Sequence, residues 1–179
     1  MKTIDDYCED CKKTLKETSY DNKNNCYMVE NEIQVIDFDL LKEKYCTDKS
    51  DIPGANRAAT SADALISRDD KVYFIEFKNG NIKKREHKSK IKSKLRDSVL
   101  IYCDITKKDL DFARENVEYI LVYNATKNSL GEIQDRISSL GNSKFCHFGL
   151  EVLKGIFALD VKTYKVEEFA EYFLKNLNI

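Results

Sequence analysis

Two acidic residues and a lysine are spaced so that together they could hold a divalent ion and a phosphate. Asp63 lies in the segment SADALIS, and Glu76 and Lys78 end the apolar run VYFIEFK. Residues two apart in a strand share one face, so Glu76 and Lys78 are expected to point the same way. Carboxylates of this kind hold Mg²⁺ together with water and substrate phosphate, and a nearby lysine stabilises developing negative charge. This combination predicts metal-dependent hydrolysis of a phosphodiester.

A short turn is expected between the two segments that carry these residues. Ala62–Ile66 and Lys71–Lys78 have the composition of strands, and Asp69-Asp70 stands between them. A two-residue turn at this position makes a hairpin in which Asp63 lies directly opposite Glu76. Carboxylates at opposed positions repel one another, so a cation is expected to compensate them.

The same residues resemble a known signature. Asp63, followed after twelve residues by Glu76-Phe77-Lys78, is similar to the D…(D/E)XK pattern of the PD-(D/E)XK nucleases, the restriction-endonuclease-like superfamily. The likeness covers residues 61–102 and includes the apolar residues before Glu76. Ala62 stands in the place of the proline that gives the pattern its name. The resemblance implies a restriction-endonuclease-like core.

The resemblance also implies a role for each residue of the pattern. Asp63 and Glu76 would be the ligands of Mg²⁺ or Mn²⁺, and Lys78 would be the catalytic lysine of a DNA endonuclease or exonuclease. Many members add an acidic ligand from an N-terminal helix, and Glu32 and Asp39 are the candidates for it here. Related enzymes are often dimers, so a homodimer is expected on the same ground.

A basic segment follows the strand that carries Glu76. Residues 83–96 read KKREHKSKIKSKLR and contain eight Lys or Arg against one Glu. The segment runs into an amphipathic helix with Ile91, Leu95 and Val99 on one face. Such a cluster suits the neutralisation of phosphates along a nucleic acid, although a solvated helix face is the alternative. The expected contacts are Lys84, Arg85, Lys88, Lys92 and Lys94.

The remaining pattern predicts a single domain of mixed α/β (α+β) class over residues 1–179, with a central mixed β-sheet flanked by helices. Residues 1–60 are expected to be an N-terminal elaboration and residues 61–102 the core that bears the motif. Further strands are expected at Cys26–Glu30 and Ile33–Phe38, which would form a hairpin, and at Val117–Tyr123 and Lys154–Val161. Helices are expected over residues 5–18, 40–45, 130–140 and 166–177, with another starting at Thr106 and Asp109.

Composition narrows the remaining possibilities. Basic and acidic residues number 30 and 31, so net charge indicates no partner. No apolar stretch approaches the roughly 20 residues of a membrane helix, and no signal peptide is recognisable. We therefore expect a cytoplasmic protein with no membrane partner. Cys8 and Cys11 have zinc-knuckle spacing with Cys26 and Cys46 as possible partners, but a second close pair is missing, so reduced thiols are expected.

Two other functions stay open on the sequence. The first is a catalytically inactive nuclease fold that binds nucleic acid or protein, as an immunity or regulatory protein would. The second is a zinc-knuckle binding protein built on Cys8 and Cys11.

Overall fold

A six-stranded mixed sheet forms the centre of the molecule. The computed structural model describes residues 4–49, 59–128 and 146–177. The sheet order is β1-β4-β5-β6-β7-β8. Neighbours from β1 to β6 are antiparallel, whereas β6, β7 and β8 run parallel to one another. The bounds are β1 Lys12–Thr14, β4 Gln34–Asp37, β5 Ala64–Arg68, β6 Lys71–Lys78, β7 Val117–Tyr123 and β8 Asp160–Lys165.

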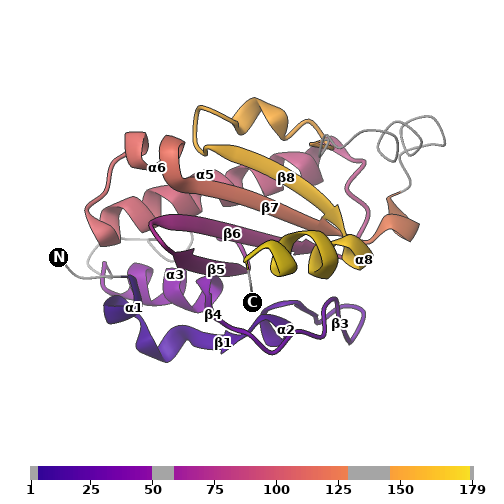
Figure 1. Cartoon of the computed structure of the whole chain (residues 1–179), viewed down its shortest axis with the longest axis horizontal. Helices are drawn as coiled ribbons and strands as arrows, with labels where there is room; N and C mark the ends of the chain where they lie inside the picture. The colour runs from indigo at the N-terminus through magenta and orange to yellow at the C-terminus, as the bar shows by residue number, and fades with distance from the viewer. Residues whose placement is uncertain (1–3, 50–58, 129–145, 178–179) are drawn as a thin grey trace.

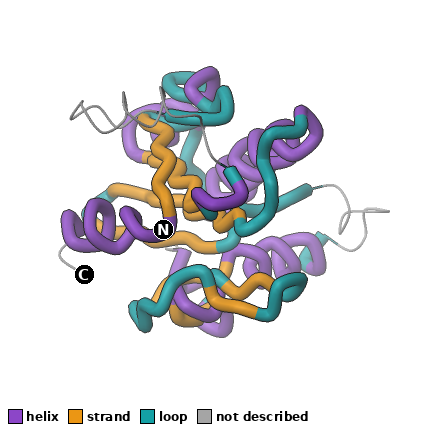
Figure 2. The backbone as a smooth tube through the Cα atoms, turned by 90° about the vertical axis from the view of Figure 1, so that its right-hand side faces the viewer, coloured by secondary structure: helices purple, strands orange, loops and turns teal. Residues whose placement is uncertain are grey.

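Helices cover both faces of this sheet, as Figures 1 and 2 show, so the mixed α/β class is confirmed. One face carries α1 (Ile4–Tyr7), α3 (Phe38–Thr47), α5 (Arg85–Thr106) and α6 (Leu110–Asn116), which contribute to one hydrophobic cluster. The other face carries α2 (Leu15–Thr18) and α8 (Val166–Phe169), and helical turns continue from α8 over residues 170–177. A small separate hairpin pairs β2 (Tyr20–Asp21) with β3 (Cys26–Tyr27).

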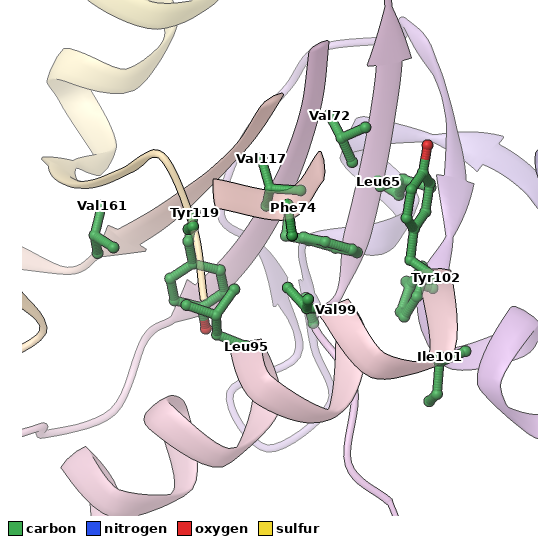
Figure 3. Packing of buried hydrophobic residues seen from close by; sticks show 14 of the residues in the cluster. Leu65, Val72, Phe74, Leu95, Val99, Ile101, Tyr102, Val117, Tyr119 and Val161 are labelled. Carbon is green, nitrogen blue, oxygen red and sulfur yellow. The ribbon is translucent and has the colours of Figure 1, made fainter. Parts of the chain in front are cut away.

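The long helix α5 is fixed by its apolar stripe. Ile91, Leu95 and Val99 recur at helical spacing and are fully buried, as the sequence predicts. Leu95 and Val99 pack over Phe74 and Tyr119 from β6 and β7, which Figure 3 shows from close by. Burial of a side chain of this size contributes about 1.5–3 kcal/mol. The stripe therefore sets which side chains of α5 face the sheet and which face solvent.

The N-terminal part differs from its predicted helix. Residues 5–18 contain a short helix, a 3₁₀ turn at Glu9–Cys11, strand β1 and helix α2. The strand forms because Lys12–Thr14 pairs with β4 at the edge of the main sheet. Helix α2 then starts in a capping box between Thr14 and Glu17. The N-terminal region thus supplies two strands of the main sheet.

Three other boundaries also differ from the sequence expectation. β4 pairs with β1 and β5, and Cys26–Tyr27 pairs with Tyr20–Asp21, so the hairpin predicted between the first strands is wrong. Helix α6 starts at the N-cap Asp109, whereas Thr106 is the last residue of α5. Residues 154–159 form a turn flanked by an isolated bridge between Lys154 and Ala158, and the strand begins only at Asp160. The helix expected over residues 130–140 lies outside the described residues.

Within residues 4–49, 59–128 and 146–177, no helix is both long enough and apolar enough to cross a bilayer.

Candidate functional site

The hairpin β5–β6 has the predicted register. Arg68 pairs with Lys71 across the turn, and Ala64 pairs with Ile75 further along. The two turn residues, Asp69 and Asp70, both have positive φ, at 48° and 61°. This backbone is that of a type I′ turn, whose twist matches the flanking strands. The local turn therefore fixes which residues of the two strands face each other.

Asp63 is held immediately before β5 by three hydrogen bonds. Its backbone N–H donates to Ile75 O at 3.0 Å, and its carbonyl accepts from Phe38 N at 3.1 Å. Its carboxylate Oδ2 accepts from Phe77 N at 2.6 Å. The residue is thus tied both to β6 and to the start of α3. Its remaining oxygen, Oδ1, points toward Glu76 and the helix α5, as its contact with Lys94 shows.

Glu76 sits deep on the face of β6 that α5 covers. Its side chain is 1% exposed, and its Oε2 accepts from Lys94 at 2.8 Å. Within the described part of the chain, its Oε1 has no hydrogen-bond partner. Lys78 lies on the same face with its Nζ 4.0 Å from Oε1. A buried carboxylate oxygen without a donor leaves free energy that a cation would recover.

Lys94 reaches the site from α5, although the sequence placed it among the surface phosphate contacts. Its Nζ lies 3.0 Å from Asp63 Oδ1 and 2.8 Å from Glu76 Oε2, and its side chain is 23% exposed. The two carboxylates therefore converge on one point, which an ammonium group holds. One feature of the sequence indicates this position: Lys94 directly precedes Leu95 of the buried stripe, so it lies at the edge of the face that meets the sheet.

Burial is the largest influence on the pKa values of Asp63, Glu76 and Lys94. Burial, and then the charge of Asp63, raises the pKa of Glu76 to about 8. Burial likewise raises the pKa of Asp63 above its ordinary value. Burial lowers the pKa of Lys94, but the neighbouring Glu76 and Asp63 outweigh it and raise the pKa overall. Tyr119, whose hydroxyl donates to the Ile91 carbonyl at 3.4 Å, has a pKa raised by burial and by the same two carboxylates.

The two candidates for a third acidic ligand lie in different places. Glu32 is 67% exposed and pairs with Lys16 at 3.7 Å, away from the site. Asp39, in the first turn of α3, accepts from the Ser61 hydroxyl, and its charge contributes to the raised pKa of Asp63. Across the described residues, however, neither joins Asp63 and Glu76 in a group whose ligand atoms all lie within 4.8 Å of one another. Asp39 is the nearer of the two candidates.

The remaining basic candidates lie on the N-terminal half of α5. Lys84 is the N-cap and its side chain makes no capping hydrogen bond, and Arg85 begins the helix. Both are exposed, and with Glu86 and Ser89 they line an open surface hollow. The free backbone amides of a helix N-terminus favour negative charge, and these two cations add to that effect. Lys88 and Lys92 follow on the same helix and are half-buried.

A cluster of amide side chains positions the loop between Lys78 and α5, and the sequence analysis missed it. Asn128 Oδ1 accepts from Ile82 N at 2.7 Å, and its Nδ2 donates to the Gly80 carbonyl at 3.0 Å. Asn124 Nδ2 donates to Asn79 Oδ1 at 2.8 Å. Together they tie the loop to the segment that follows β7. The only sequence signal was the recurrence of asparagine after two apolar strands.

Cys8 and Cys11, which have the spacing of a zinc knuckle, lie with their sulfurs against one another at the 3₁₀ turn Glu9–Cys11. The 3₁₀ turn between them brings their Cα atoms to 5.3 Å, and both side chains are buried. The carboxylate of Asp10 lies within 4.8 Å of both sulfurs. Neither Cys26 nor Cys46 completes a larger ligand group with them among the described residues.

Comparison of the chain with protein-family models, with curated proteins and with solved structures found no match.

Proposed function

We propose that this protein hydrolyses phosphodiester bonds of nucleic acid, with DNA as the favoured substrate, in a metal-dependent reaction of the PD-(D/E)XK type. The observation that carries the proposal is the convergence of Asp63 and Glu76 on a single cation position, with Lys78 on the same face. Opposed carboxylates in a buried strand end are costly for folding. A role in binding a cation and a phosphate would account for these carboxylates, which lie next to the basic N-terminal half of α5.

The donor set fits a hard divalent ion. Asp63 Oδ1 and Glu76 Oε2 lie within 3.0 Å of one point, and Glu76 Oε1 has no hydrogen-bond partner within the described part of the chain. Mg²⁺ is held in proteins by one or two carboxylates, with water and phosphate completing its shell. When bound, Mg²⁺ or Mn²⁺ would polarise the phosphate and promote ionisation of the attacking water.

The chain's own residues would divide the remaining work. Lys78, one third exposed, lies beside Glu76 and can place its ammonium against a phosphate oxygen as negative charge develops. Lys84 and Arg85, at the start of α5, would hold the phosphates of the neighbouring backbone. The amides of Asn79 and Asn128 would keep the intervening loop in one conformation. The proposal includes a cytoplasmic location, as expected from the sequence.

The test is cleavage of plasmid and linear DNA, and of an RNA of matched length, with Mg²⁺ or Mn²⁺. Asp63→Asn, Glu76→Gln and Lys78→Met are each expected to lower the rate at least about a hundredfold, as loss of one charge-stabilising group does elsewhere. Lys90→Met removes a charge from an exposed position of α5 and serves as the matched control. Cleavage by Asp63→Asn at the wild-type rate would refute the assigned site.

A second candidate function follows from Lys94. Its ammonium already bridges Asp63 and Glu76, so the three residues could be a permanent buried ion-pair triad in a binding protein without catalysis. This function predicts no heat on titration with Mn²⁺ and nucleic-acid binding that survives Lys78→Met. A Mn²⁺ isotherm that Glu76→Gln abolishes would exclude it.

A further inference from the structure

Lys94 places an ammonium group where a divalent ion would have to lie. Its Nζ is 2.8 Å from Glu76 Oε2 and 3.0 Å from Asp63 Oδ1. An Mg²⁺ ion held by the same oxygens would lie about 2.0–2.1 Å from each, in the space that the ammonium fills. Two cations cannot share that space, because their repulsion over a few ångströms is large in a partly buried site.

We propose that Lys94 is a built-in counter-cation that must leave the two carboxylates before a divalent ion binds, an inference that rests on the proposed metal function. In the metal-free protein it donates to one oxygen of Asp63 and one of Glu76, which lie too close together to be left without a positive charge. It therefore keeps the site assembled and lowers the affinity for metal at the same time.

The side chain can leave without movement of the backbone. Ile91, Leu95 and Val99 are fully buried and hold α5 against the sheet, so the helix itself is fixed. The lysine stem has four flexible carbons, and the side chain is 23% exposed, which gives it access to solvent. Exposed Lys90 lies one helical turn earlier on the same face, where the released ammonium would meet solvent.

Release would free the ammonium of Lys94 on the helix that carries the phosphate-binding candidates. A nucleic-acid backbone bound along α5 would attract the ammonium away from Asp63 and Glu76. Such an exchange makes metal and nucleic acid each favour the other's binding, because coupling between two binding equilibria is reciprocal. Metal would then bind chiefly when substrate is present.

Calorimetric titration of the full chain with MnCl₂ tests this exchange. Lys94→Met is expected to bind Mn²⁺ about 10–100-fold more tightly than wild type, the range over which groups beside a metal site change its affinity. Lys90→Met, which removes the same charge one turn away, is expected to bind as wild type does. If Lys94→Met binds no more tightly while Glu76→Gln abolishes the wild-type isotherm, the counter-cation is overturned and the metal function stands. If neither wild type nor Lys94→Met binds Mn²⁺, both are overturned.

A measurement on the wild-type protein covers the case in which Lys94→Met does not fold. An amine held between two carboxylates reacts slowly with an acetylating reagent, whereas a released amine reacts as an exposed lysine does. Mass spectrometry is expected to show that Mg²⁺ speeds the acetylation of Lys94 several-fold relative to Lys90. An unchanged ratio in saturating Mg²⁺ would refute the displacement.

Discussion

Replacing Glu76 by glutamine should stabilise the metal-free protein at neutral pH. The carboxyl is buried, with a side chain 1% exposed, and its pKa rises from an ordinary 4.5 to about 8 in the folded chain. A carboxyl with a higher pKa in the folded than in the unfolded chain takes up a proton on folding, so its ionised form opposes folding at every pH above the ordinary value. At pH 7 the raised pKa of Glu76 lowers the free energy of unfolding by about 3 kcal/mol.

Glu76→Gln removes this destabilisation. It also costs about 1 kcal/mol, because the hydrogen bond of glutamine with Lys94 is weaker. The free energy of unfolding should therefore rise by about 2 kcal/mol at pH 7, which corresponds to an increase in Tm of roughly 4–8 °C. The gain should vanish at and below the ordinary pKa of 4.5, grow as pH rises, and level off above the folded-state pKa of about 8.

The assay is urea unfolding followed by circular dichroism, with a chelator present, at several values of pH. Glu115→Gln, at an exposed position of α6, is the control and should leave stability unchanged. If Glu76→Gln is instead less stable than wild type at pH 7, the reasoning fails. Glu76 would then be a fully paired anion in a structural triad with Lys94, because breaking such a pair costs about 3–5 kcal/mol.

Two further predictions follow from the turn and from the basic helix. Asp70→Gly should raise the free energy of unfolding by about 0.5–1 kcal/mol, because glycine adopts the positive φ of 61° without steric cost. A loss of stability in urea would contradict the type I′ turn. Lys84→Ala should weaken DNA binding and reduce by about 1 the slope of the logarithm of the binding constant against the logarithm of salt concentration. An unchanged slope in fluorescence anisotropy would remove Lys84 from the interface.

The local pattern of the sequence was enough to predict the centre of the molecule. Lys71–Lys78 and Val117–Tyr123 were predicted with the bounds that the structure has, because each is a long apolar run between turn residues. The register of the β5–β6 hairpin followed from the two-residue turn at Asp69-Asp70. Side-chain alternation then put Glu76 and Lys78 on one face. These features depend on residues close together in sequence, so sequence alone determined them.

Tertiary structure decided the pairings between distant segments. Lys12–Thr14 is a strand only because β4 lies beside it, and β4 pairs with β1 and β5 rather than with β3, the strand before it in sequence. Segments this short contain too few residues for their hydrophobic pattern to specify a pairing partner. Hydrogen bonding to the edge of a neighbouring strand therefore decides whether they form a strand. Strand β8 likewise begins at Asp160, where it pairs with Glu118 of β7.

The sequence predicted only part of the site. Spacing and parity predicted that Asp63, Glu76 and Lys78 lie together, but they did not predict that Lys94 contacts both carboxylates. A lysine at the border of a helix's buried face reaches either solvent or the sheet, and its long stem allows both. The deep carboxylates of Asp63 and Glu76 decided the outcome here, because they lie within reach of that stem and a buried pair of like charges requires a cation.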